Sequence, residues 1–218
     1  METIRINRAA FSDVFWSVIF DHTADSPKKA DLMVDLENLD MNREYADYNT
    51  GSISLTSGWA LYSLARYFQP KFIAEVGTFI GRSTVALHRG APDAEIHTCD
   101  ASNSIDIGLN PAYVTQYHKC FAHEMFKGLQ GRTVDLMHID GRLSDEDLAT
   151  MPQTVVFAVD DFEGNEKGVA NLMKMNDIEK THQIVYPPSR CVLNNYGFNG
   201  ICNTAVFLPY NMIRFVRQ

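Results

Sequence analysis

The chain has 218 residues, of which 45% are hydrophobic and 21% are charged, and its formal net charge is −8. This length and composition fit one soluble globular domain with a full hydrophobic core, or one domain with a small cap. Its longest basic run is the pair Lys28-Lys29, which argues against nucleic acid as a partner, since sequence-independent nucleic-acid binding needs clustered basic side chains.

Neither a membrane-spanning segment nor a signal peptide is expected. No apolar stretch approaches the roughly 18 residues that cross a bilayer, and polar residues interrupt the apolar segment Phe11–Phe20. The four cysteines show no C-x-x-C spacing, so we interpret them as free thiols. These features predict a cytoplasmic enzyme or binding module whose partner is a small molecule and not a membrane. They leave open whether the chain forms a homo-oligomer.

Residues 1–50 are predicted to form a helical appendage or lid on a domain that spans residues 51–218. Ser12-Asp13, followed by apolar residues at helical spacing, indicates a capped amphipathic helix. Residues 21–50 are polar and lack a clear period, which favours a mobile connector or lid. A further helix is predicted to begin at Ser57-Gly58 and to end at Gln69-Pro70.

Beyond this helix, short apolar strands alternate with helical segments, and the stretch after Pro111 is ambiguous. The strands are expected over residues 71–76, 95–99, 134–139 and 154–159, with a closing pair over 183–186 and 204–208. Helices are expected over 81–89, 145–151 and 164–175. This alternation predicts an α/β fold with a doubly wound, mostly parallel sheet covered on both faces. Because no helix is evident between the closing strands, one antiparallel strand is expected at the edge of the sheet.

The first strand runs into the sequence E-V-G-T-F-I-G-R-S at residues 75–83. Gly77 allows a tight turn, Gly81 allows a close backbone approach, and the free amides of the following helix favour a negative group. The dinucleotide-binding pattern G-x-G-x-x-G would need a glycine where Phe79 stands. Glu75 suits a cationic group such as an α-ammonium. The alternative is an ordinary strand–turn–helix junction.

Asp100 follows the second predicted strand directly. A carboxylate at this strand tip is placed to accept two hydrogen bonds from a ribose diol, a device shared by nicotinamide-binding and adenosylmethionine-binding proteins. The residue therefore indicates a nucleoside ligand without choosing between these two. The alternative is that Asp100 only caps the next turn.

Three more carboxylates follow later strands, with Asp140 after residues 134–139 and Asp160-Asp161 after residues 154–159. Because they follow neighbouring buried strands, the three carboxylates are expected to converge on one spot. Like charges brought together are unfavourable unless a proton or a cation compensates them. Hard divalent cations such as Mg²⁺ prefer oxygen ligands of this kind. The alternative is that one or two of these side chains cap helices or face solvent.

These segments together resemble the class I S-adenosyl-L-methionine (SAM)-dependent methyltransferases. Within that class the chain is most similar to the metal-dependent O-methyltransferases of the catechol and caffeoyl-CoA type, and to their relatives that act on macrolide sugars. The resemblance runs from about residue 50 to about residue 174. It depends on residues 75–83, on Asp100, on I-D-G at 139–141 and on V-D-D at 159–161.

The resemblance implies a Rossmann-like fold, SAM as methyl donor, a small-molecule hydroxyl as acceptor and a divalent cation, with Mg²⁺ expected. It implies that Glu75 holds the methionine ammonium, that Asp100 holds the ribose and that Asp140 has the catalytic role. The residues expected around the cofactor are Glu75, Gly77, Thr78, Phe79, Gly81, Ser83, Asp100, Cys120, Phe121 and Asp140. The residues expected to bind the metal are Asp140, Asp160 and Asp161.

The chain departs from the family pattern at two positions. The family commonly has a Lys or His three residues after the first metal aspartate, where it helps to deprotonate the acceptor, whereas this chain has Leu143. The third metal ligand of the family is often Asn, so Asp161 adds a negative charge.

Two other functions are therefore kept open. One is an NAD(P)-dependent oxidoreductase, against which Phe79 argues, and the other is a methyltransferase-like binding protein without catalysis, which Leu143 favours. The acceptor is expected to contact the variable loops 21–55 and 190–203. Aromatic residues near or within these loops either line its pocket or pack in the core: Tyr45, Tyr48, Trp59, Tyr196 and Phe198.

Overall fold

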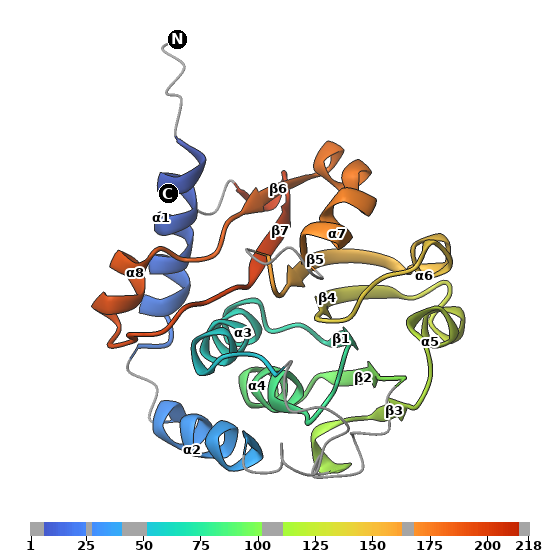
Figure 1. Ribbon diagram of the computed structural model, residues 1–218, viewed down its shortest axis with the longest axis horizontal. Helices are drawn as coiled ribbons and strands as arrows, with labels where there is room; N and C mark the ends of the chain where they lie inside the picture. Colours follow the sequence, from blue (N-terminus) through green and yellow to red (C-terminus); the bar gives the residue numbers. More distant parts are fainter. Residues whose placement is uncertain (1–6, 25–27, 41–51, 102–110, 163–167, 214–218) are drawn as a thin grey trace.

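The computed structural model describes residues 7–24, 28–40, 52–101, 111–162 and 168–213, which form a seven-stranded sheet in the order β3-β2-β1-β4-β5-β7-β6 (Figure 1). The strands are β1 (Phe72–Val76), β2 (Glu95–Cys99), β3 (Gln116–His118), β4 (Thr133–Ile139), β5 (Gln153–Val159), β6 (His182–Val185) and β7 (Ala205–Pro209). Strands β1 to β5 are parallel, and β7 is antiparallel to both of its neighbours. The predicted α/β, doubly wound sheet is therefore confirmed.

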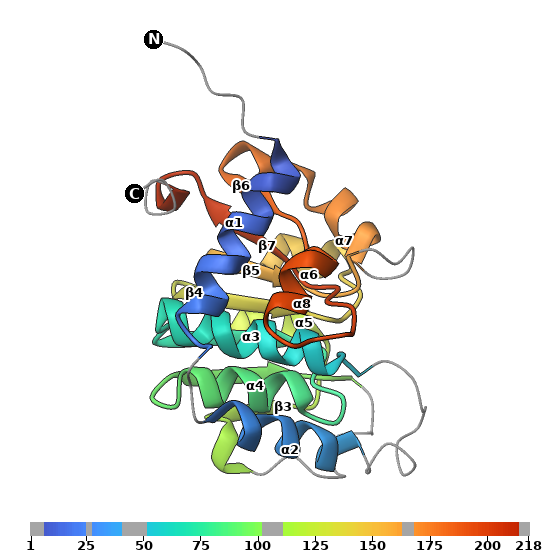
Figure 2. The ribbon, with the colours of Figure 1, turned by 90° about the vertical axis from the view of Figure 1, so that its left-hand side faces the viewer.

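Helices cover both faces of this sheet (Figures 1 and 2). On one face lie α1 (Arg8–Asp21), α3 (Leu55–Phe68), α4 (Arg82–Gly90) and α8 (Arg190–Asn195). On the other lie α5 (Ala122–Gly128), α6 (Asp145–Thr150) and α7 (Gly168–Lys174), and α2 (Lys28–Asp40) packs outside α3 and α4. Two 3-10 turns occupy Pro111–Tyr113 and Asn176–Lys180. No helix in the described part of the chain is both long and apolar enough to cross a membrane.

Capping residues determine where α3, the helix before the first strand, begins and ends. Ser54 is the N-cap of α3, and its hydroxyl accepts a hydrogen bond from the amide of Ser57 at 2.9 Å. Gln69 ends the helix in the left-handed conformation, with φ at 46°, directly before Pro70. The predicted end of this helix is confirmed, and its start lies two residues before the predicted Ser57.

The N-terminal helices belong to the main core. Trp16 on α1 and Leu32 and Leu36 on α2 are fully buried, and the indole nitrogen of Trp16 donates to the carbonyl of Tyr186 at 2.8 Å. The connector predicted over residues 21–50 is wrong where α2 forms. Leu32, Met33, Leu36 and Leu39 pack in or against the core, but they lie among charged residues and the amphipathic period of α2 is weak. Residues 41–51, with Tyr45 and Tyr48, lie outside the described residues.

Two further segments differ from their predictions. The ambiguous stretch after Pro111 contains β3 and α5, and the closing strands are connected by the short helix α8, which the sequence analysis did not predict. Ser189 caps this helix by accepting from the amide of Val192. The antiparallel strand expected at the sheet edge is β7, and it lies one place inside the outermost strand β6.

The assignment of α2 to the core predicts a difference between two substitutions on this helix. Leu36→Ala should lower the free energy of unfolding by about 2–5 kcal/mol, because it leaves a cavity against α3. Val34→Ala is the matched control, since Val34 is 54% exposed and its loss should change stability by less than about 0.5 kcal/mol. Urea unfolding of the two variants measures both values. Equal effects would show that α2 does not contribute to the core.

Candidate functional site

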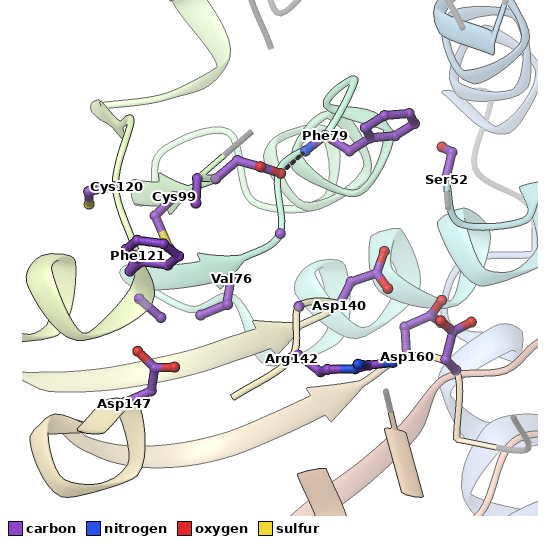
Figure 3. Close-up of a pocket in the computed structure, with 16 residues that line it drawn as sticks. Ser52, Val76, Phe79, Cys99, Cys120, Phe121, Asp140, Arg142, Asp147 and Asp160 are labelled. Atoms are coloured by element: carbon purple, nitrogen blue, oxygen red, sulfur yellow. Dashed lines mark hydrogen bonds between the residues drawn. The ribbon is translucent and has the colours of Figure 1, made fainter. Parts of the chain in front are cut away.

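A cavity of about 760 Å³ opens at the carboxyl ends of the parallel strands (Figure 3). It lies where β1 is flanked by β2 on one side and β4 on the other, which is the point at which the strand order reverses. Ligands of open α/β sheets bind at this position. The lining residues follow the tips of β1, β2, β4 and β5 or begin α5, with Ser52 and Asp147 added.

The turn after β1 is held close to the segment after β4. Gly77 has φ of 94°, and a Cβ at this position would lie 2.9 Å from the carbonyl carbon of Asp140 and from the amide nitrogen of Gly141. A side chain is therefore excluded by backbone conformation and by space. Phe79, which also lines the cavity, has φ of 45°, and Gly81 is the N-cap of α4 with φ of 84°.

Thr78 belongs to this turn and Ser83 to the start of α4, and both are almost fully buried. The hydroxyl of Thr78 is hydrogen-bonded to the hydroxyl of Thr98 on β2. Neither Thr78 nor Ser83 lines the cavity, and nor does Gly81. The structure thus brings Gly77 and Phe79 to the cavity wall. Thr78, Gly81 and Ser83, which were also predicted to surround the cofactor, lie away from the wall.

Glu75 is fully buried beneath the cavity and does not line it. One carboxylate oxygen accepts from the hydroxyls of Thr84 at 2.5 Å and Thr98 at 2.6 Å, and the other lies 3.2 Å from Nδ1 of His138. Burial alone would raise the pKa of the Glu75 carboxyl, but the hydrogen bond and charge of His138 hold that pKa below its usual value. Glu75 therefore connects β1, β2, β4 and α4. Its predicted contact with an ammonium group stays a prediction.

Asp100 lies at the tip of β2, as predicted, and lines the cavity. One of its carboxylate oxygens accepts from the amide of Phe79 at 2.7 Å (Figure 3). Its own amide donates to the carbonyl of His118 on β3 at 3.2 Å. These bonds fix the carboxylate beside the turn after β1, where a ribose diol could be bound.

The far end of the cavity is formed by Cys120, Phe121 and Ala122, at the start of α5. The ring of Phe121 is 63% exposed, so it offers an apolar surface to a planar ligand. Burial raises the pKa of the Cys120 thiol, which disfavours the thiolate. The predicted pair Cys120 and Phe121 is thus brought to the wall.

The sequence analysis missed Asp147, which also lines this end and is 4% exposed. Its carboxylate accepts from the amide of His123 at 2.6 Å, and from the amide and hydroxyl of Ser144 at 2.6 and 2.7 Å. It therefore stabilises the starts of both α5 and α6. The spacing Ser144-x-x-Asp147 is a capping signal, but its contact with His123 is not visible in the sequence.

Asp140, Asp160 and Asp161 come together at the other end, with one carboxylate oxygen from each within 4.8 Å of the others. Asp140 and Asp160 are 8% and 4% exposed, and Asp161 is half-buried with φ of 57°. The convergence predicted from the strand tips is therefore confirmed. Two oxygens bound to one Mg²⁺ or Ca²⁺ lie at most about 4–5 Å apart, so the three carboxylates fit one hard cation.

Asp160 is held by residues far away in the sequence. Its carboxylate accepts from the hydroxyl of Thr204, just before β7, at 2.6 Å, and it also interacts with Ser57 on α3. Burial and the neighbouring charge of Asp161 raise the pKa of Asp160, and the bond from Thr204 opposes the shift. Neither Thr204 nor Ser57 carries a local motif that points to this role.

Leu143, at the position where the resemblance predicts a Lys or His base, is 3% exposed and packs in the core. Its amide donates to the side-chain oxygen of Asn171 at 3.0 Å, and the Asn171 amide group donates to the carbonyl of Gly141 at 2.8 Å. Arg142 between them lines the cavity instead, which the sequence analysis did not single out. Position 143 therefore lacks a base for two reasons, because its residue is a leucine and because its side chain is buried away from the cavity.

Of the aromatic residues considered for an acceptor pocket, Trp59 lies in the core, and Tyr196 and Phe198 are half-buried against it. Trp59 is fully buried and stacks on Tyr62, and Phe198 lies 6.1 Å from Trp59 between ring centroids. The hydroxyl of Tyr196 donates to the carbonyl of Ser17 on α1 at 3.0 Å. None of the three described residues, Trp59, Tyr196 and Phe198, lines the cavity.

The fold is that of solved O-methyltransferases. The O-methyltransferase TomG from Streptomyces achromogenes, involved in tomaymycin synthesis and solved with SAM, has a TM-score of 0.58 at 19% identity, over 95% of this chain and 99% of that one. An O-methyltransferase from Bacillus cereus with S-adenosylhomocysteine (SAH) has a TM-score of 0.57 at 15% identity, over 88% and 97%. The SAH-bound methyltransferase PaMTH1 from Podospora anserina has a TM-score of 0.58 at 17% identity, over 96% and 99%.

No family model matches the chain, and no curated protein matches it. The likeness to the solved structures therefore shows the Rossmann-like methyltransferase fold, and the function has to be argued from the residues of the site.

The close approach at Gly77 predicts that its replacement is more destabilising than replacement of another glycine with positive φ. Gly77→Ala should lower the free energy of unfolding by clearly more than the roughly 1–2 kcal/mol that left-handed φ costs a non-glycine residue, since its Cβ meets rigid backbone. Gly131→Ala is the control, because φ there is 79° but no atom lies within 4 Å of an added Cβ. Urea unfolding compares them, and equal losses would contradict the close approach.

Proposed function

We propose that this chain is a SAM-dependent O-methyltransferase that acts on the hydroxyl group of a small molecule, assisted by a divalent cation at Asp140, Asp160 and Asp161. The observation that carries the proposal is the arrangement of one cavity. Asp100, suited to a ribose diol, lies beside the turn after β1, and a cluster of three carboxylates lies at the opposite end from Phe121. The methyltransferase fold supports the same assignment.

The cavity fits SAM by size and by the chemistry of its wall. Its volume of about 760 Å³ falls within the range of about 300–1,000 Å³ that is usual for small-molecule sites. Phe121 offers an apolar face to an adenine ring, and Asp100 offers carboxylate oxygens to the ribose. Gly77 and Phe79, on the turn after β1, line the wall where the methionine portion would lie. This order of contacts would direct the sulfonium methyl toward Asp140.

Bound SAM would supply an electrophilic methyl group to the acceptor oxygen and would leave as SAH, while the hydroxyl proton of the acceptor would pass to water. Phe121, Asp100 and the turn at Gly77 are the parts of the wall that would hold SAM. The chain contributes mainly orientation, because two reactants held in line react as one molecule. The amide of Asp140 donates to the carbonyl of Val76 at 2.8 Å, so the acceptor end is held rigidly against the turn after β1.

A divalent cation supplies positive charge that lowers the pKa of the acceptor hydroxyl. Such help is needed because the described cavity wall contains no histidine, lysine or tyrosine. Burial raises the pKa of both Cys99 and Cys120, so neither thiol is suited to act as a base at neutral pH. Water is therefore the proton acceptor in this mechanism.

A second function, that of a methyltransferase-like binding protein, is favoured by one observation, the burial of Leu143 where the family has its base. Binding of SAM and NAD should be compared by calorimetry, and turnover should be measured with a panel of hydroxylated acceptors. Tight SAM binding without turnover on any acceptor would favour the binding protein. Preference for NAD would overturn both assignments.

The role given to Asp100 predicts that Asp100→Ala weakens SAH binding by about 1–3 kcal/mol, or roughly 5-fold to 150-fold, because a ribose hydroxyl loses its acceptor. Asp93→Ala, in the exposed turn before β2, removes the same charge away from the cavity and should leave the affinity unchanged. Isothermal titration calorimetry gives both values at one site per chain. Unchanged affinity in Asp100→Ala would remove this residue from the cofactor site.

The proposed cation predicts that EDTA abolishes methyl transfer and that Mg²⁺ restores it. Asp160→Asn should weaken Mg²⁺ binding roughly tenfold or more while SAH binding is kept, because a charged oxygen ligand is lost. Asp161→Asn is the contrast, since asparagine tolerates the left-handed backbone at this position and removes a repulsive charge. Titrations with Mg²⁺ and SAH measure both variants. Full turnover in EDTA would overturn the metal role.

A further inference from the structure

Arg142 lies at the end of the cavity that we assign to the methyl acceptor. It follows Asp140 by two residues, its side chain is exposed, and it lines the cavity wall. Figure 3 shows the side chain extending toward Asp160, at the end opposite to Cys120 and Phe121. Its backbone is held on both sides, because Asn171 binds the carbonyl of Gly141 and the amide of Leu143.

Arg142 is also the one cationic side chain of the described cavity wall. The wall carries five carboxylates, those of Asp100, Asp140, Asp147, Asp160 and Asp161. Within the described part of the chain, the guanidinium group makes no hydrogen bond and no ion pair with them or with any other residue. A guanidinium that faces a ligand cavity without a protein partner is suited to bind a carboxylate through two parallel hydrogen bonds.

We propose that Arg142 recognises a carboxylate on the acceptor, so that the substrates are small hydroxylated carboxylic acids. This inference rests on the proposed methyl transfer and adds a substrate class to it. The charges of the wall would also orient such an acceptor. Its carboxylate is repelled by the aspartates and attracted to Arg142, so the hydroxyl group is the part that turns toward Asp140 and Asp160.

The methionine part of SAM carries a carboxylate as well, and that group is the alternative ligand for Arg142. The geometry favours the acceptor. In Figure 3, Phe79, on the turn that would surround the methionine, and Arg142 lie on opposite sides of Asp140. The experiment therefore measures the two ligands separately.

The test compares 3,4-dihydroxybenzoate with 3,4-dihydroxybenzamide, which has nearly the same shape without the charge. Calorimetry on the SAH complex gives the affinity for each compound without any turnover, and steady-state kinetics with SAM give KM and kcat. Arg142→Ala should weaken benzoate binding and raise its KM about tenfold, the loss of one exposed charge-assisted contact. Binding of the benzamide and of SAH should stay unchanged.

Two further variants separate the charge of Arg142 from its donor geometry and provide a control. Arg142→Lys keeps the charge but loses the planar pair of donors, so its benzoate affinity should fall between those of the wild type and Arg142→Ala. Arg66→Ala removes a positive charge at the exposed end of α3, away from the cavity, and should behave as the wild type.

Equal affinity of the wild-type complex for the two compounds, or no affinity for either, would overturn the proposal. So would a loss of SAH binding in Arg142→Ala, which would assign the residue to the cofactor. Binding of the benzoate that depends on Arg142, without methyl transfer in the wild type, would support the carboxylate site and overturn the proposed enzymatic function.

Discussion

The site depends on one close contact between backbones, where the turn after β1 meets the segment after β4. The backbone of Gly77 lies against the backbone of Asp140 and Gly141. A Cβ at position 77 would collide with these atoms, so only glycine allows the contact. The amide of Asp140 donates to the carbonyl of Val76, and the amide of Gly77 donates to the carbonyl of Cys99. The tips of β1, β2 and β4 are thereby joined. Asp100, which would bind the ribose, and Asp140, which would serve the acceptor, face one cavity because of this contact.

Beneath this contact, each carboxylate is oriented by partners from other elements. Glu75 is paired with His138 and receives two threonine hydroxyls, all fully buried. A buried pair of this kind adds little net stability, because desolvation offsets much of the attraction. It does require β1, β2 and β4 to keep one register, since a slip by one residue would leave the charge unpaired. Asp160 is held in a comparable way by Thr204, which lies just before β7 and 44 residues further along the chain.

The parts of the site that follow local rules could be predicted from the sequence. Residues at the tips of buried strands, such as Asp100 and Asp140, were located because strands and turns have short-range patterns and parallel strand ends share one edge. The missed residues, such as Thr204 and Asp147, act through partners distant in the chain. Helix α2 was missed for a related reason, because its stability comes from burial against α3 and α4 and not from a strong period of its own. The contact predicted between Glu75 and the ammonium group of SAM stays a prediction, because it depends on a ligand as well as on the fold.

The contacts of α1 have a consequence for how the chain reaches its native state during synthesis. Ser12 binds the amide of Tyr186, Asp13 binds Ser189, and Ser17 receives the hydroxyl of Tyr196, across sequence separations of 174, 176 and 179 residues. These bonds of α1 thus form with segments that are synthesised more than 170 residues later. Closing loops of this length is slow, and until then the apolar face of α1, with Trp16 and Phe20, has no complete surface to cover it. A truncation near residue 186 is accordingly expected to release α1 from the core as well as to remove α8 and β7.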